Sequence, residues 1–180
     1  MHQFFRVTPL ALAIAVASPC VARAQLLGGG AKINIGAGAT FPTGDFGSFN
    51  NTGYNLAGGI NLFQTGIPIG ARIEGMYNSF SSSGGFGGTT VSGGVTANVT
   101  YDIPIGALPG LTTLYGIGGI GYYHTNDPSS LIGAVDAVGW NIGAGIRFPL
   151  TGFSAYIESR YHRISNADAS YFPVTFGLMF

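Results

Sequence analysis

The sequence predicts an all-β protein, an eight-stranded antiparallel up-and-down transmembrane β-barrel that follows a cleavable signal peptide. Charged residues make up only 8% of the 180 residues, whereas about 25% is usual in a soluble domain. Hydrophobic residues make up 46%, and beyond the N-terminus they alternate with small and polar residues. This alternation recurs in eight segments that Gly, Pro, Asn and Ser separate. A soluble sandwich also alternates, so the placement of the aromatic residues, the kinds of connection and the placement of the charges decide for strands that cross a membrane.

The N-terminal segment has the three parts of a secretory signal. His2 and Arg6 give a basic start, Val7–Val21 is mostly apolar, and Ala22-Arg23-Ala24 is a small-x-small cleavage site. We therefore expect residues 1–24 to be a signal peptide and residues 25–180 to form the barrel domain.

An uncleaved anchor helix is the alternative for this segment. Its apolar run is shorter than the roughly 20 residues that a spanning helix needs, and Pro9 and Pro19 interrupt it. Cys20, the only cysteine, is expected to leave with the signal, so the mature chain has neither a disulfide nor a thiolate site. The mature chain would keep 5 basic and 7 acidic residues, a balance that predicts no nucleic-acid partner.

Eight segments of the mature part are expected to be strands. Most have about 9–13 residues, the length that a tilted strand needs to cross a bilayer, and none shows a 3.6-residue apolar period, so no helix is predicted. The segments are Lys32–Phe41, Tyr54–Phe63, Ile69–Phe80, Thr90–Asp102, Thr112–Thr125, Val138–Phe148, Ser154–Ile164 and Pro173–Phe180.

Successive side chains of a strand point to opposite faces, so alternation gives one apolar and one polar face. Ile33, Ile35, Ala37, Ala39 and Phe41 share a face of the first segment, and the fourth follows the same rule. The fifth segment is rich in glycine from Tyr115 to Gly121, and it has no clear phase, which means that the sequence does not show which alternate residues form its apolar face. In the sixth, the apolar face holds Trp140, Ile142, Ala144, Ile146 and Phe148, against Asn141, Gly143, Gly145 and Arg147.

Aromatic residues of the apolar faces gather near the segment ends. If the N-terminus lies on the periplasmic side, Phe41, Tyr54, Tyr77, Trp140 and Tyr161 fall at the outer end, and Tyr101, Phe148 and Phe180 fall at the inner end. Mainly aliphatic residues and glycine lie between them. Two aromatic girdles around an aliphatic band are typical of outer-membrane barrels.

The connections also alternate in kind. One side has shorter, proline-bearing connections, and the other has generally longer ones that are rich in Gly, Asn and Ser, as expected of periplasmic turns and surface loops. The first set is Gln64–Pro68, Ile103–Leu111 and Pro149–Phe153; the second is Pro42–Gly53, Ser81–Thr89, Asn126–Ala137 and Ser165–Phe172.

Charged residues within the segments lie on the polar faces, apart from Arg163 near an outer end. Inside a narrow barrel, unpaired ions cost several kcal/mol, so we expect these groups to be paired. The predicted lumen network comprises Arg72, Glu74, Asp102, Arg147, Glu158, Arg160 and His162. An eight-stranded barrel has an interior just wide enough for side chains to fill.

From about Gly30 to Phe180 the sequence resembles the OmpA-like small outer-membrane β-barrel family. The resemblance lies in Phe-Pro-Thr-Gly-Asp-Phe at 41–46, in Gly139–Gly145, in Arg160–Ile164 and in Pro173–Phe180. It implies a closing strand that the barrel-assembly machinery recognises, through Val174, Phe176, Leu178 and Phe180, with Gly177 at the small position. Because the chain stops at Phe180, we expect no peptidoglycan-binding domain after the barrel.

One sequence resembles a catalytic motif. His162 to Ala167 is similar to the His-x-Ser-Asn-Ala motif of lipid A deacylase barrels, but it has one extra residue between His162 and Ser165. Strand residues three apart point to opposite faces, and the orienting Glu of those enzymes is missing. We therefore expect no catalytic residue, and no cofactor or metal, since His124 and His162 stand apart from other ligand types.

The sequence thus predicts a non-enzymatic, monomeric outer-membrane protein that contributes to envelope integrity or surface interaction through four outer loops. Its expected partners are outer-membrane lipid and lipopolysaccharide. The loop carboxylates Asp127 with Asp136, or Asp45 with Asp168, could bind divalent cations that bridge lipopolysaccharide, but most such residues are simply solvated. Two alternatives stay open. One is a narrow channel for ions or small molecules, and the other is a lipid A-modifying enzyme.

Overall fold

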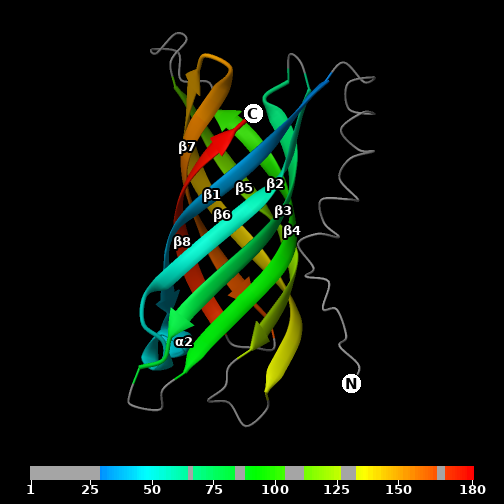
Figure 1. Ribbon diagram of the computed structural model, residues 1–180. Coiled ribbons are helices and arrows are strands. Elements are labelled where there is room, and N and C mark those ends of the chain that lie inside the picture. Colours follow the sequence, from blue (N-terminus) through cyan, green and yellow to red (C-terminus); the bar gives the residue numbers. More distant parts are fainter. Residues whose placement is uncertain (1–28, 65–66, 84–87, 104–111, 127–132, 166–168) are drawn as a thin grey trace, which may run out of the picture.

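The computed structural model describes residues 29–64, 67–83, 88–103, 112–126, 133–165 and 169–180. Within these residues, eight antiparallel strands follow one another around a closed barrel, and the last pairs with the first (Figure 1). The predicted fold class is confirmed. The predicted signal peptide, residues 1–24, lies outside the described residues.

Each strand coincides with one predicted segment, with ends that differ by up to four residues. The strands are β1 Gly29–Thr43, β2 Gly53–Gln64, β3 Ile69–Ser81, β4 Thr89–Ile103, β5 Thr113–Asn126, β6 Ala134–Leu150, β7 Phe153–Ile164 and β8 Ala169–Met179.

The largest differences occur at the starts of β6 and β8, which each begin four residues before the predicted start. Asn126 still pairs with Ala134, and Ile164 with Ala169, so the ladders extend beyond the alternating apolar pattern. Proline cannot donate a ladder hydrogen bond, so within sheets it is common at the first residue of a strand. Pro173 instead lies within β8, where the pairing with β7 skips from Val174 to Tyr171 while the pairing with β1 continues.

A short helix, α2 (Gly44–Phe49), lies in the connection between β1 and β2. The sequence prediction of no helix is wrong here, because six residues are too few to show a helical period. Gly44 has a φ of 59°, the left-handed conformation that glycine adopts without a steric penalty. The helix lies at the end of the barrel far from the C-terminus (Figure 1). We call this end the α2 end and the other the opposite end.

At the opposite end, β6 and β7 are longer than predicted and leave the two-residue turn Thr151-Gly152, with Gly152 at a φ of 87°. Two-residue connections of this kind are common in hairpins.

The predicted phases of β1, β4, β6 and β7 are confirmed. On β6, Ile142 faces outward with 60% of its surface exposed, whereas its neighbour Asn141 faces inward with 2% exposed. The structure also gives β5 its phase, since Tyr115 and Tyr123 are buried inside and Ile120 faces outward. No helix of the described residues is long and apolar enough to span a bilayer.

Several aromatic residues of the predicted girdles form outward-facing pairs. At the α2 end, ring centroids lie 5.1 Å apart for Phe41 and Phe172, 6.2 Å for Tyr54 and Tyr77, and 5.7 Å for Trp140 and Tyr161. At the opposite end, Phe153 and Phe180 are 6.1 Å apart, and Tyr101 and Phe148 are exposed.

Candidate functional site: the barrel lumen

Four charged residues from two strands meet near the middle of the lumen. We call Arg72 and Glu74 of β3 and Glu158 and Arg160 of β7 the charge quartet. Arg72 Nη1 lies 2.7 Å from Glu158 Oε2 and 3.6 Å from Glu74 Oε1. Arg160 donates from Nε to Glu158 Oε1 at 2.8 Å and from Nη2 to Glu74. Two guanidinium groups thus neutralise two carboxylates at full burial, which is how buried ions are tolerated.

Polar and aromatic residues satisfy further atoms of the quartet. Asn34 donates to Glu74 Oε1 at 2.8 Å, Arg72 Nε donates to Asn61 Oδ1 at 2.6 Å, and Tyr115 Oη donates to Glu158 Oε2 at 2.7 Å. The Arg72 guanidinium also lies 5.8 Å and 5.7 Å from the ring centroids of Tyr115 and Tyr156. Such cation–π contacts add to ion pairing where water is excluded.

Glycines leave the space that the lumen tyrosines occupy. A Cβ added at Gly145 would lie 2.5 Å from the Tyr115 ring, and one added at Gly177 would overlap the Tyr156 ring. A Cβ at Gly121 or Gly139 would lie 2.9 Å from Tyr123. Each of these tyrosine rings therefore packs against a glycine, which has no side chain to collide with it.

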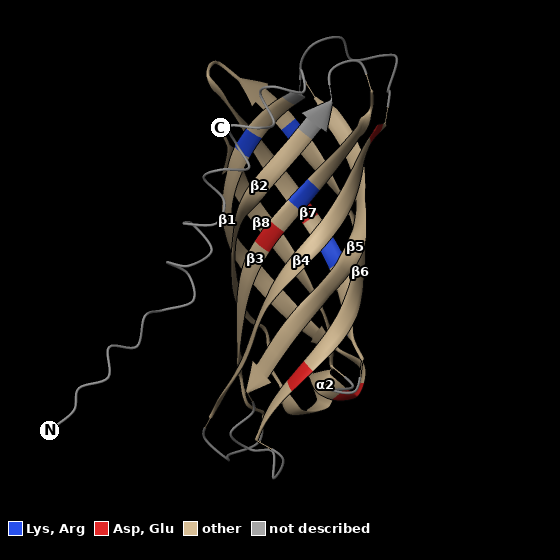
Figure 2. Ribbon diagram, turned by 90° about the vertical axis from the view of Figure 1, so that its right-hand side faces the viewer, with Lys and Arg blue, Asp and Glu red and all other residues tan. Residues whose placement is uncertain are grey.

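Asp102 and Arg147 form a separate pair towards the opposite end. Arg147 Nη1 lies 3.2 Å from Asp102 Oδ2, and the Arg147 guanidinium lies 4.9 Å from the Tyr115 centroid. Of the seven residues predicted for the lumen network, the structure brings four together as the quartet and two as this pair. Figure 2 shows that charged residues occupy few positions of the barrel.

His162, the seventh predicted residue, lies apart from the ion pairs, within an apolar and aromatic cluster. Its Nδ1 lies 2.9 Å from Tyr123 Oη, and its ring stacks on Tyr171. We call the surrounding buried group the aromatic cluster, and it comprises Met76, Phe80, Tyr123, Ala137, Ile164, Ala169 and Tyr171, with Phe46 of α2 packed against it.

The sequence prediction of a lumen filled by ion pairs and hydrogen bonds missed this cluster. The alternation of faces predicts an inward direction for Phe80, which is an even number of residues from Arg72 and Glu74 on β3 and lies on the same face. Tyr123 depended on the undetermined phase of β5, and Tyr171 precedes the predicted start of the last strand.

The residues that resemble a deacylase motif lie in different environments. His162 is buried in the lumen, and Ser165 is exposed in the turn after β7. Asn166 to Asp168 lie outside the described residues.

The structure does not bring together the carboxylates that could bind cations, and two of them lie outside the described residues. Asp136 lies in β6 and not in a loop as predicted, because β6 begins at Ala134, and its Oδ1 is 2.8 Å from His124 Nδ1. Asp45 is exposed on α2, while Asp127 and Asp168 lie outside the described residues. In the described part of the chain, no group of three or more metal-ligating side chains is placed to hold an ion.

The predicted assembly residues lie on β8 and just after it. Phe176, Leu178 and Phe180 are exposed on the outward face, while Gly177 lies beneath the Tyr156 ring. The Phe180 N–H donates to Ile33 O at 2.8 Å, and the Ile33 N–H donates to Phe180 O at 3.0 Å, which joins the C-terminus to β1.

Comparison with solved structures finds outer-membrane barrels of similar fold. The N-terminal barrel of Pseudomonas aeruginosa OprF has 16% sequence identity and a TM-score of 0.53, over 83% of this chain and 97% of that one. Neisserial surface protein A has 10% sequence identity and a TM-score of 0.57, over 84% of this chain and 97% of that one. Ail, the attachment invasion locus protein of Yersinia pestis, has 19% sequence identity and a TM-score of 0.55, over 85% of this chain and 99% of that one.

A search of curated proteins found no match. The family model for the outer membrane protein beta-barrel domain matches residues 8–180, nearly the whole sequence. With its eight strands, closed topology and polar, side-chain-filled lumen, the chain belongs to the outer membrane protein β-barrel family.

Proposed function

We propose that this protein is a non-enzymatic barrel of the bacterial outer membrane, exported by its N-terminal signal, that contributes to envelope integrity or surface interaction. It does so as a sealed scaffold, with the connections at the α2 end facing the cell exterior. The observation that carries the proposal is the filled lumen, in which the charge quartet blocks the middle and the aromatic cluster blocks the α2 end.

A sealed lumen argues against the channel alternative. An ion that entered would have to separate the quartet, whose charges are fully buried and mutually neutralised. It would also have to cross the aromatic cluster, which offers few polar atoms to replace its water. Transfer of an unpaired ion into such surroundings costs several kcal/mol.

Conductance of the purified protein in planar bilayers tests the sealed scaffold. We expect no discrete channel openings from the wild-type protein. A variant that opens both barriers serves as the comparison and should conduct more often: Phe80→Ala and Tyr171→Ala open the aromatic cluster, and Arg72→Ala and Glu158→Ala remove one arm of the charge quartet. Regular openings of the unmodified protein would support the channel alternative.

The location and partners need separate tests. We expect the protein in the outer-membrane fraction of cells, without residues 1–24, and we expect protease added to intact cells to cleave at the α2-end connections. Lipopolysaccharide and outer-membrane lipid are the proposed partners of the exposed apolar face and of these connections. Recovery in the soluble fraction would contradict the proposal.

Surface interaction is supported by the kind of protein that shares this fold. One structural relative, Ail, is called the attachment invasion locus protein of Yersinia pestis. In this chain, α2 presents exposed Phe49 and Asp45 on the surface connection between β1 and β2. Loops carried by a rigid scaffold commonly hold the binding residues of such proteins.

The enzyme alternative is tested by mass spectrometry of lipid A from cells with and without the protein. We expect identical acyl chains in both, and in cells that express His162→Ala. The burial of His162 away from the outward face supports this expectation. Acyl loss that depends on the protein would contradict a non-enzymatic role.

A further inference from the structure

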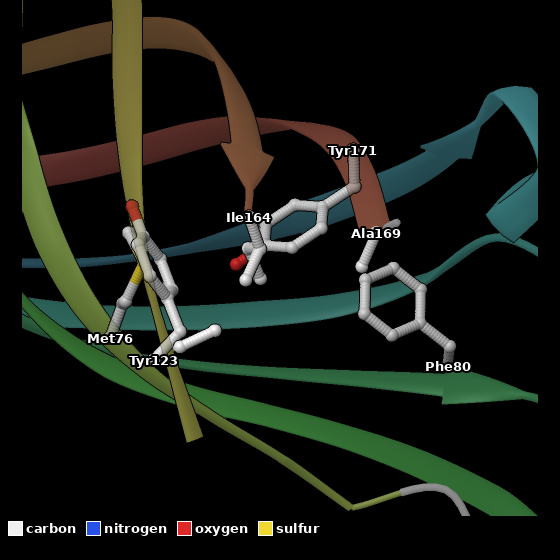
Figure 3. Close-up of a cluster of buried hydrophobic side chains, with 7 residues drawn as sticks. Met76, Phe80, Tyr123, Ile164, Ala169 and Tyr171 are labelled. Carbon is white, nitrogen blue, oxygen red and sulfur yellow. The ribbon is translucent and has the colours of Figure 1, made fainter. Parts of the chain in front are cut away.

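His162 is enclosed on two sides by aromatic rings. Its ring stacks on Tyr171 at a centroid distance of 5.2 Å and an interplanar angle of 13°, and Tyr123 meets it edge-on at 6.0 Å and 83°. The side chain is 0% exposed. Figure 3 shows Tyr123 and Tyr171 facing the same space from β5 and β8.

The hydrogen bonds of His162 suit the neutral imidazole. Nδ1 is bonded to Tyr123 Oη, and Nε2 has no hydrogen-bond partner among the described residues. A neutral ring can leave one nitrogen as an unmet acceptor, whereas an imidazolium has two N–H groups, each of which needs an acceptor.

The groups that face His162 offer no negative charge for a proton. Tyr123 of β5 and Tyr171 of β8 are neutral phenols, and Asn141 of β6, which pairs across the strands with His162, is an amide. Arg160, two residues earlier on the same face of β7, carries a positive charge. The carboxylates beyond it, Glu74 of β3 and Glu158 of β7, are already bound by two guanidinium groups.

A continuous series of rings connects this histidine with the surface helix. Tyr171, stacked on His162, lies 5.4 Å from Phe80 and 6.5 Å from Phe46 of α2, and Phe46 meets Phe80 edge-on at 5.2 Å. Beside these rings, Thr43, which precedes α2, donates from Oγ1 to Ser170 Oγ at 3.0 Å. The position of α2 therefore depends on the same packing that encloses His162.

We propose that His162 is an acid-responsive latch, which holds α2 against the barrel while the imidazole is neutral and releases it when the imidazole takes up a proton. Protonation adds a second positive charge beside Arg160, inside an apolar enclosure. The state in which the cluster opens and water reaches His162 binds the proton more readily. Proton linkage therefore favours that state as the pH falls below about 6.5, the usual value for histidine.

The test places a spin label on α2 of the membrane-assembled protein. Ser48→Cys on the exposed side of α2 is labelled in a full chain that also carries Cys20→Ser. We expect the label to become more mobile when the pH falls from 7.5 to 5.0. The His162→Phe variant keeps an aromatic ring against Tyr171 but cannot be protonated, so its label should keep the same mobility at both pH values.

His124 provides the matched control. It is the other histidine of the expected mature chain, and it lies exposed on β5 beside Asp136. The His124→Gln variant should keep the full pH response. An unchanged label in the unmodified barrel would overturn the latch, as would an equal response in His162→Phe. If His162→Phe fails to assemble, His162→Gln takes its place with the same expected outcome.

Discussion

Side chains inside the barrel are accommodated one by one, and a single added methyl group tests this. Gly145→Ala would bring a Cβ to 2.5 Å from the Tyr115 ring, whose hydroxyl donates to Glu158. We expect a loss of about 1–3 kcal/mol in the free energy of unfolding, the usual cost of overpacking. Urea unfolding in lipid vesicles, followed by the fluorescence of Trp140, measures it.

The control lies on the adjacent strand. Gly116 of β5 pairs with Ala144, the neighbour of Gly145 on β6, and it faces outward. A Cβ added at Gly116 would meet nothing within 4 Å. Gly116→Ala should leave the unfolding free energy nearly unchanged. Similar losses in the two variants would show that the tyrosine–glycine packing is not what stabilises the lumen.

Outward-facing residues should respond to charge according to depth. Ile142 lies at the middle of β6 and is exposed on the apolar face. Ile142→Arg is expected to cost about 2–4 kcal/mol, since a guanidinium at the bilayer midplane loses its water. Val138→Arg on the same face, nearer the α2 end, should cost only about 0–1 kcal/mol. Equal costs, measured by urea unfolding, would contradict the membrane position of β6.

At the scale of elements, the charge quartet joins β3 to β7 across the lumen, although these strands do not pair in the sheet. Arg72→Met and Glu158→Gln each leave buried charges without their partner, so each should cost about 3–5 kcal/mol. The double variant should cost less than the sum, by a coupling of about 0.5–3 kcal/mol. Additive losses in a double-mutant cycle would show that the ion pair does not couple the strands.

The closing strand gives a second prediction at this scale. β8 completes the barrel by pairing with both β1 and β7, and Phe180 extends the pairing with Ile33. Deletion of Phe180 should slow barrel assembly in cells, as judged by the rate at which the folded gel band appears. Phe153→Ala removes the ring that contacts Phe180 but keeps the terminus. This variant should therefore assemble faster than the protein that lacks Phe180. The reverse order would contradict the role of the terminal residue.

For the molecule as a whole, closure of eight strands predicts resistance to detergent. Every strand has two hydrogen-bonded neighbours, so no unpaired strand edge is left for detergent to reach. We expect the unheated protein to migrate as a compact band in detergent gels and to shift after boiling. A single band position with and without heat would contradict a stable closed barrel.

The sequence determined the number of strands, their order and, outside β5, which face of a strand is apolar, because alternation with a period of two is a local property of the chain. Arg72 and Glu74 follow from parity alone, as do Asn141 and Ile142. Where glycine dominates, the alternation does not show which face is apolar, so the directions of Tyr115 and Tyr123 on β5 were not predictable from their own segment.

Only the tertiary structure decided which inward residues meet. The stagger of the strands brings Glu158 to Arg72, which is 86 residues away, and places His162 among tyrosines while Arg160, on the same face of β7, joins the ion pairs. It likewise brings Phe46 of a six-residue helix into contact with Phe80 and Tyr171. Such contacts depend on closure and register, which are properties of the whole barrel and leave no periodic trace in any one strand.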